Sequence, residues 1–250
     1  MRAKKRLGQH FLRDEAVIQH ILQLIKVKCP LDMPLVEVGP GQGILTRDLY
    51  DTYQKFKAVE FDRDMIAILE ADIPSKSLIQ ADFLRLDIRE LFGDKQYCLA
   101  GNFPYNISTQ IIFKLIENRE RIPVMVGMFQ KEVAERICAT PQGKKIGIIS
   151  ILAQAHYKAE KIFDISPLAF DPPPRVDSSI IVLTRRENFE IDCDYKTFKK
   201  IVKMAYGQRR KKLRNTLKSV LEDLENPILQ KRPEELSVQD FIDITKLIKK

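Results

Sequence analysis

The feature that most constrains the fold is a short apolar run that ends in a glycine-rich turn. The run Leu35–Val38 leads directly into Gly39-Pro40-Gly41-Gln42-Gly43, and a helical pattern starts at Ile44. Glycine permits a backbone with positive φ and lets a ligand approach the main chain. A strand, a glycine turn and a helix in this order predict a nucleotide-binding sheet edge. Pro40 departs from the GxGxxG dinucleotide pattern, and turn geometry alone also explains a single glycine turn.

The rest of the chain alternates apolar runs with helical patterns, which is typical of an α/β fold with a parallel sheet. Further strands are expected at 57–61, 77–81, 97–101, 124–129 and 179–184. Helical periodicity covers 14–27, 44–50, 63–71, 107–118, 131–140 and 146–156. Beyond residue 186 the strand signals stop, and helices are expected at 198–206, 211–222 and 238–248. We therefore predict two domains, an α/β domain at 1–186 and a helical domain at 187–250.

Charge distribution indicates a polyanionic partner. The chain carries a formal net charge of +8, and residues 195–221 hold ten Lys or Arg and no Asp or Glu. A solvated face usually mixes both signs, so this stretch favours contact with nucleic acid.

Cysteine, histidine and apolar content exclude other classes of protein. The four cysteines and three histidines are scattered and form no metal-ligand cluster, so no metal site is expected. Thiols of this kind fit a cytoplasmic protein. No run of eighteen apolar residues occurs, and we expect no membrane span.

Polar side chains follow successive expected strands. Glu60 lies 21 residues beyond Gly39, the spacing at which an acidic side chain reaches ribose hydroxyls. Asp82 is placed to accept from an adenine amino group, and Asn102 follows the next strand. Singly, Glu60 could be a surface charge and Asp82 an N-cap. Because ligands bind beyond the carboxyl ends of parallel strands, the four positions together predict one cofactor site.

The stretch Asn102-Phe103-Pro104-Tyr105 predicts a site for a flat base with an exocyclic amine. The side-chain oxygen of Asn102 can accept one N–H, and the carbonyl of Phe103, held outward by Pro104, can accept the other. Tyr105 offers a stacking face, although it could also be a packed aromatic at a strand end. An amine held in this way points to methyl transfer.

These motifs resemble the KsgA/Dim-type small-subunit rRNA adenine N6,N6-dimethyltransferases. The resemblance spans nearly the whole chain, and its motifs are specific when taken together. In this sequence they are Leu7-Gly8-Gln9-His10-Phe11-Leu12, Glu37-Val38-Gly39-Pro40-Gly41, Glu60-Phe61-Asp62, Gly101-Asn102-Phe103-Pro104-Tyr105-Asn106-Ile107-Ser108, Phe170-Asp171-Pro172-Pro173-Pro174-Arg175-Val176-Asp177-Ser178 and Gln208-Arg209-Arg210-Lys211-Lys212-Leu213-Arg214-Asn215. The family commonly has Leu where Phe103 stands and often Asn where His10 stands.

The resemblance implies a class I S-adenosylmethionine-dependent methyltransferase, with a Rossmann-like seven-stranded sheet, an antiparallel last strand and a small all-α C-terminal domain that contacts RNA. It implies cofactor contacts at His10, Leu12, Gly39, Gly41, Glu60, Asp82 and Asn102. It implies contacts to the target base at Asn102, Pro104, Tyr105 and Phe170. Phe170 reads as a core residue on its neighbours alone, and the resemblance makes it a second stacking face. RNA phosphates are expected to contact Lys4, Lys5, Arg6, Arg209, Arg210, Lys211, Lys212 and Arg214.

The implied substrate is a pair of adjacent adenines in the 3′-terminal hairpin of 16S rRNA, within a 30S assembly particle. Dimethylation of both would accompany small-subunit biogenesis by a cytoplasmic and monomeric enzyme. Three alternatives stay open: a large-subunit rRNA methyltransferase of the erythromycin-resistance type, a DNA adenine methyltransferase, and a non-catalytic assembly or transcription factor that kept the fold.

Overall fold

The computed structural model describes residues 9–141, 143, 145–221 and 223–248. The chain forms two compact units, one of Met1–Ala134 with Glu160–Arg185 and the other of Glu135–Ala159 with Arg186–Lys250. The segment 135–159 therefore groups with the C-terminal residues by its contacts. The expected division into domains at residue 186 stays a prediction.

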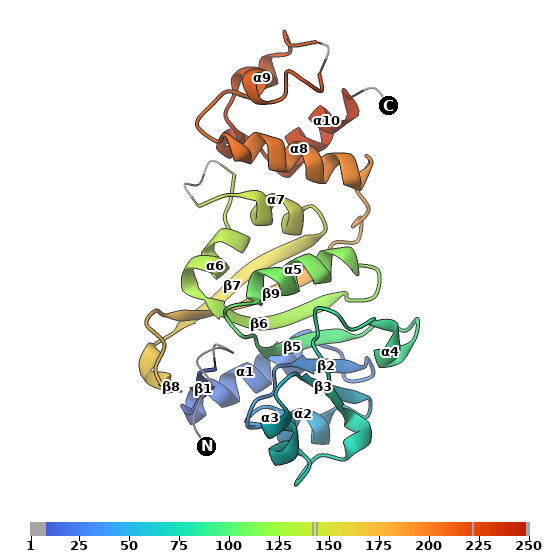
Figure 1. Ribbon diagram of the computed structural model, residues 1–250, viewed down its shortest axis with the longest axis vertical. Helices are drawn as coiled ribbons and strands as arrows, with labels where there is room; N and C mark the ends of the chain where they lie inside the picture. The colour runs from blue at the N-terminus through green and yellow to red at the C-terminus, as the bar shows by residue number, and fades with distance from the viewer. Residues whose placement is uncertain (1–8, 142, 144, 222, 249–250) are drawn as a thin grey trace. The chain divides into compact units, whose positions relative to one another are not determined.

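A seven-stranded sheet carries the fold, in the order β4-β3-β2-β5-β6-β9-β7 (Figure 1). The pairs from β4 to β6 are parallel, and β9 pairs antiparallel with β6. The predicted α/β fold, its parallel sheet and its antiparallel last strand are confirmed. The strands are β2 (Leu35–Val38), β3 (Phe56–Glu60), β4 (Leu78–Gln80), β5 (Cys98–Asn102), β6 (Val124–Gln130), β7 (Tyr157–Ile165) and β9 (Ser178–Arg185).

Helices of the first unit bury apolar faces on this sheet. In α1, Asp14 caps the start by accepting from the Val17 N–H at 3.1 Å, and Ile18, Ile21, Leu22 and Ile25 face the core. Burying each such side chain contributes about 1.5–3 kcal/mol. In Figure 1, α5 lies in front of the sheet and α1 behind it. The helices are α1 (Glu15–Lys28), α2 (Thr46–Thr52), α3 (Arg63–Leu69), α4 (Arg89–Phe92) and α5 (Ser108–Glu117); α6 (Lys131–Ile137) follows β6.

The second unit is helical. In α8, Phe198, Ile201, Val202 and Ala205 are buried at the spacing of one helix face. The prediction of a helix at 211–222 is correct at 213–216 and wrong at the other described residues of this range. The helix α9 ends at Thr216, and turns follow it. The helices are α7 (Ile148–Gln154), α8 (Tyr195–Gly207), α9 (Leu213–Thr216) and α10 (Val238–Lys246).

Two strand pairings have no counterpart among the patterns of the sequence. The edge strand β7 has only its two end residues buried, so the sequence contains no apolar run that would predict it. The short strands β1 (Phe11–Leu12) and β8 (Phe170–Asp171) form an antiparallel ribbon, with Leu12 opposite Phe170. This ribbon ties the N-terminal segment to the loops that precede β9. Within the described part of the chain, every helix is too short or too polar to span a bilayer.

Candidate functional site

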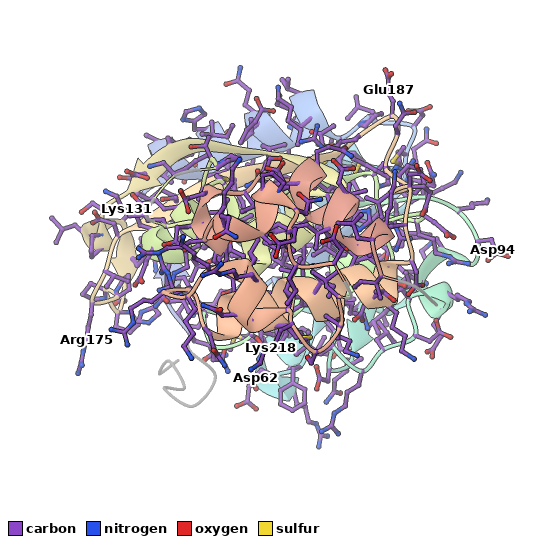
Figure 2. All side chains as sticks on the ribbon, turned by 90° about the horizontal axis from the view of Figure 1, so that it is seen from above. Asp62, Asp94, Lys131, Arg175, Glu187 and Lys218 are labelled. Atoms are coloured by element: carbon purple, nitrogen blue, oxygen red, sulfur yellow. The ribbon has the colours of Figure 1, made fainter. Side chains whose placement is uncertain are left out.

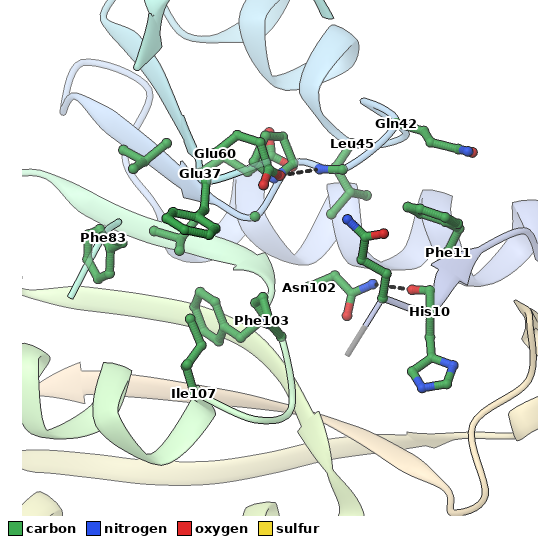
Figure 3. Close-up of a pocket in the computed structure, with 18 of the residues that line it drawn as sticks. His10, Phe11, Glu37, Gln42, Leu45, Glu60, Phe83, Asn102, Phe103 and Ile107 are labelled. Carbon is green, nitrogen blue, oxygen red and sulfur yellow. Dashed lines mark hydrogen bonds between the residues drawn. The ribbon is translucent and has the colours of Figure 1, made fainter. Parts of the chain in front are cut away.

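A cavity of about 350 Å³ lies at the carboxyl edge of the parallel strands in the first unit (Figure 3). Its walls come from the segments that follow β2, β3, β4 and β5, together with residues 9–13. The parallel register brings these strand ends together, as the sequence predicted for one shared site. Of the predicted contacts, the cavity is lined by His10, Leu12, Gly39, Gly41, Glu60, Asp82, Asn102, Pro104 and Tyr105.

The backbone of the glycine turn favours glycine at two positions. Gly39 and Gly41 have φ values of 70° and 55°, a region that other residues rarely adopt. A Cβ on Gly39 would lie 3.2 Å from Pro104 Cδ, and one on Gly41 would lie 3.4 Å from the ring of Phe11. The bare main chain of the turn thus borders the cavity, in the manner of a cradle for a nucleotide-like ligand.

The carboxylate of Glu60 fixes this turn. Its Oε2 accepts from the Gly41 N–H at 3.1 Å, and its Oε1 accepts from the Asp62 N–H at 2.8 Å. Burial raises the pKa of Glu60 above its ordinary value, while these N–H donors act in the opposite direction. Each carboxylate oxygen keeps a further lone pair that can accept from a ribose hydroxyl. The structure thus leaves room for the predicted contact between Glu60 and a sugar. Anchoring the glycine turn is an additional role of Glu60.

Asp82 caps a loop and also borders the cavity, and its contact to a ligand stays a prediction. Its Oδ1 accepts from the Leu84 N–H at 2.9 Å, so it caps the loop that follows β4. The same residue lines the cavity beside Ala81 and Phe83. A cap does not exclude a ligand contact, because a carboxylate has about four acceptor positions.

Lys114, a residue without a role in the sequence analysis, holds this loop from the side of α5. Its Nζ donates to the carbonyls of Leu84 at 3.1 Å and Leu86 at 2.6 Å, and lies 5.2 Å from the centre of the Phe83 ring. Burial lowers the pKa of Lys114, whereas Asp82 and neighbouring acids favour its charged form. The ammonium therefore positions the loop that carries Asp82 and Phe83.

We expect Lys114→Met to raise the Kd for S-adenosylmethionine about tenfold, since hydrogen bonds from a charged group contribute about 1.5–3 kcal/mol. Titration calorimetry measures this. Lys57→Met is the matched control, because Lys57 donates to the Glu90 carbonyl at 3.5 Å and lies 5.4 Å from the Phe92 ring, away from the cavity. Equal cofactor affinity in the two variants would contradict this role of Lys114.

Asn102 presents one defined side-chain atom to the cavity. Its Nδ2 donates to the carbonyl of His10 at 3.2 Å (Figure 3). Since the amide nitrogen is engaged, Oδ1 is the atom available to accept a hydrogen bond from a ligand amine. This orientation matches the acceptor role that the sequence assigned to Asn102.

Tyr105 is fixed by contacts with two distant segments. Its hydroxyl shares a hydrogen bond of 2.5 Å with Ser178 Oγ, and its ring lies 5.5 Å from the His10 ring at an interplanar angle of 27°. The Nδ1 of His10 in turn donates to the Pro172 carbonyl at 2.8 Å. Burial raises the pKa of Tyr105, so its hydroxyl is neutral at physiological pH. The ring is held in one orientation beside the cavity.

Phe170 lies in the hydrophobic core and is 4% exposed. It is not among the residues that line the cavity described above. Its use as a second stacking face stays a prediction, and in this structure His10 is the ring that stacks on Tyr105.

Residues 9–13 form more of the site than the sequence analysis assigned. Gln9 Nε2 donates to Asp62 Oδ2 at 3.0 Å, and Arg13 Nη2 donates to Gln42 Oε1 at 2.8 Å. With Phe11 against Gly41, this segment contacts both the glycine turn and the end of β3. The motif Gly8-Gln9-His10-Phe11-Leu12 contained these residues, but no local pattern assigned Gln9 or Phe11 a partner.

The predicted RNA contacts are partly described. Lys4, Lys5 and Arg6 lie outside the described residues. Arg209, Arg210, Lys211, Lys212 and Arg214 are all exposed, in the turns between α8 and α9 and in the first turn of α9. Lys218 and, in the other unit, Arg175 are further exposed cations and are labelled in Figure 2. Among the described residues, no group of three or more His, Cys, Asp or Glu could hold a metal ion.

Sequence comparison identifies one family. The model of the family "Ribosomal RNA adenine dimethylase" matches residues 1–250. The ribosomal RNA small subunit methyltransferase A of Phocaeicola vulgatus is 47% identical over 98% of this chain and 89% of the relative. The protein of the same name from Porphyromonas gingivalis is 44% identical over 99% of this chain and 98% of the relative.

Solved structures share the fold. A dimethyladenosine transferase from Plasmodium falciparum aligns with a TM-score of 0.79 at 23% identity, covering 96% of this chain and 99% of its own. The 23S rRNA methyltransferase ErmE aligns with a TM-score of 0.69 at 19% identity, covering 94% of this chain and 99% of its own.

Proposed function

The chain belongs to the ribosomal RNA adenine dimethylase family, and we propose that it dimethylates N6 of two adjacent adenines in the 3′-terminal hairpin of 16S rRNA. The observation that carries this proposal is the juxtaposition of two ligand sites in one cavity. The cradle of Gly39, Gly41 and Glu60 borders the same space as the side chain of Asn102 and the ring of Tyr105. A methyl donor and a flat base with an amine can therefore meet there.

The residues fit S-adenosylmethionine, the cofactor of this family. Gly39 and Gly41 leave the main chain accessible, Glu60 has acceptors for ribose hydroxyls, and Asp82 has acceptors for an adenine amine. When bound, the cofactor supplies an electrophilic methyl group on its sulfonium. The chain positions the two partners.

The target amine is a weak nucleophile because its lone pair is delocalised into the purine ring. Asn102 Oδ1 accepts one N–H, and the Phe103 carbonyl accepts the other, so the nitrogen turns towards the methyl group. Positioning of this kind contributes roughly 7–11 kcal/mol in well-oriented systems, so no strong base is needed. The methylated ammonium is acidic and loses its proton to water. For the second transfer, the monomethyl amine keeps one N–H for these acceptors.

RNA phosphates are held by the exposed basic cluster Arg209, Arg210, Lys211, Lys212 and Arg214, together with the N-terminal Lys4, Lys5 and Arg6. Such contacts supply salt-sensitive affinity and little sequence readout. Selection of the two adenines comes from the shape of the RNA and from extrusion of each base into the cavity. The partner is a 30S assembly particle, and the protein acts as a monomer in the cytoplasm, where such particles form.

We expect the double variant Arg210→Gln with Lys211→Gln to weaken RNA binding. The negative slope of log K against log salt should become shallower by about 1.4–1.8, because each lost phosphate contact removes about 0.7–0.9. Fluorescence anisotropy at several salt concentrations measures this slope. The pair Lys55→Gln with Lys95→Gln makes the same charge change at exposed sites of the first unit. An unchanged slope in the first pair, or the same loss in both pairs, would refute a specific contact.

Unmethylated 30S particles and protein-free 23S rRNA, each incubated with labelled S-adenosylmethionine, test the function. Nucleoside analysis of the 30S sample should give N6,N6-dimethyladenosine at two adjacent positions. Label only in 23S rRNA would favour the erythromycin-resistance type of enzyme. Cofactor binding without label in either RNA would favour a non-catalytic assembly role.

A further inference from the structure

Glu37 is a buried acid that the proposed chemistry does not use. It lies at the centre of the sheet on β2, opposite Ala58 of β3 and Ala100 of β5. The residue borders the cavity and is 1% exposed (Figure 3). Its Oε2 makes no hydrogen bond with any described residue. An ionised carboxylate that is buried without a partner is energetically costly. The protonation state of Glu37 therefore needs an explanation.

The surroundings of Glu37 favour its neutral form. Burial raises the pKa of Glu37 to about 8; the nearby Thr46 hydroxyl acts in the opposite direction, and the negative charge of Glu60 adds a smaller increase. The Thr46 Oγ1 itself completes no hydrogen bond within the described part of the chain. Asp82 adds a further acid to the cavity wall.

Basic groups of the cavity wall are directed elsewhere. Arg13 donates to Gln42, and Arg47 pairs with Asp72 Oδ2 at 2.5 Å and donates to the Gly43 carbonyl. His10 donates to the Pro172 carbonyl. None of these contacts reaches Glu37, so the buried acid faces a cavity whose central charges are acidic.

We propose that Glu37 carries a proton at neutral pH in the free protein and releases it when the cationic cofactor enters the cavity. The inference rests on the proposed use of S-adenosylmethionine. The sulfonium gives this cofactor a net charge of +1, whereas the S-adenosylhomocysteine left after transfer has no sulfonium. Ionised Glu37 therefore attracts the first more strongly than the second. The residue thereby favours the loaded cofactor over the spent one, acting across the cavity through its field and not by contact.

Titration calorimetry at pH 7 in two buffers of different ionisation enthalpy counts the released protons. Glu37 is mainly protonated at this pH, because burial raises its pKa to about 8. We expect release approaching one proton per S-adenosylmethionine bound, and clearly less per S-adenosylhomocysteine. The wild-type protein alone thus tests the proposal, because equal release with both ligands would overturn it.

Glu37→Gln, which mimics the protonated acid, assigns the proton to this residue. In this variant we expect proton release to vanish and the preference for S-adenosylmethionine over S-adenosylhomocysteine to stop rising between pH 6 and 9. The exposed Glu70→Gln is the matched control and should behave as wild type. Undiminished proton release in Glu37→Gln would assign the proton elsewhere. Failure of the proposed cofactor use would look different, because no binding heat would appear with either ligand.

A stability measurement checks the same protonation without any ligand. The folded protein holds the proton of Glu37 up to about pH 8, whereas the unfolded chain loses it near its ordinary pKa of 4.5. Between these values the folded state binds more protons, so the free energy of unfolding falls as pH rises. We expect Glu37→Gln to remove this part of the decline in urea unfolding. A decline identical to that of wild type would contradict the assignment.

Discussion

Asn102→Ala is expected to lower the rate of methyl transfer by about 10³-fold or more while the affinity for RNA stays near that of wild type. The variant removes the side-chain oxygen that accepts from the target amine. It also removes the Nδ2 that is bonded to the His10 carbonyl at 3.2 Å. Loss of one preorganised polar group costs about 10²–10³ in rate, and misplacement of the base adds to this. Single-turnover assays with saturating RNA measure the effect.

Asn118→Ala is the matched control for this prediction, because Asn118 directly follows α5 and its Nδ2 donates to the nearby Lys114 carbonyl. It should leave the rate within about threefold of wild type. RNA binding of the Asn102 variant, measured by anisotropy, separates loss of chemistry from loss of substrate. Near-normal dimethylation by Asn102→Ala would remove the residue from the proposed mechanism.

Gly127→Ala is expected to impair both stability and transfer, although it adds a single methyl group. The new Cβ would lie 2.2 Å from Phe103 Cε2 and 3.0 Å from Phe129 Cε2. Phe103 is fully buried and borders the cavity, so its ring can yield only by displacing its neighbours or by moving into the site. Overpacking of this kind costs about 1–3 kcal/mol, and a shift of the Asn102–Tyr105 loop by about 1 Å can cost about 10²-fold in rate. Thermal unfolding and single-turnover assays measure the two effects.

Phe103→Leu should rescue Gly127→Ala, because the smaller side chain vacates the ring positions that the new methyl group would meet. A double-mutant cycle should give a favourable coupling of about 1–3 kcal/mol in the free energy of unfolding. Phe129→Leu is the matched control, since its ring meets the new Cβ only at 3.0 Å, and its rescue should be smaller. Equal rescue by both changes would show that Phe103 is not the residue displaced.

The central strands and the convergence of their ends could be predicted from the sequence. β2, β3, β5 and β6 are almost wholly buried, and such strands appear as short apolar runs. The sequence order of Gly39, Glu60, Asp82 and Asn102 then determines one shared edge, because parallel strands end on the same side. The structure brings all four to one cavity.

The edge strand β7 could not be predicted in this way. It carries Lys158, Glu160 and Lys161 between its two buried ends, so neither an apolar run nor a clean alternation is present. Its place beside β9 depends on distant partners, such as Ser179 Oγ, which donates to Asp164 Oδ1 at 2.6 Å.

The expected helix at 211–222 failed for a related reason. Leu213, Leu217 and Leu221 are spaced as on one face of a helix, and all three are buried. The chain buries them with one helical turn followed by non-helical turns, so the spacing alone does not require a continuous helix. The Leu213 N–H donates to the Lys231 carbonyl at 3.0 Å, a tertiary contact that no local pattern carries.

Site residues that came from long-range contacts were also missed. Lys114 reaches back about thirty residues to the loop after β4, and Ser178 reaches Tyr105 across 73 positions. Neither residue type indicates such a role in the sequence, because lysines on helices and serines at strand starts are common. These partners position the residues that the motifs did reveal.

A structure of the protein with S-adenosylhomocysteine and an RNA that contains the two adenines tests the central claim most directly. The distances to measure run from the N6 atom of the extruded adenine to Asn102 Oδ1 and to the Phe103 carbonyl oxygen. We predict that both are about 2.7–3.2 Å, with the base stacked on Tyr105 and N6 facing the sulfur. An adenine bound with N6 away from Asn102, or outside the cavity beside the glycine turn, would contradict the account.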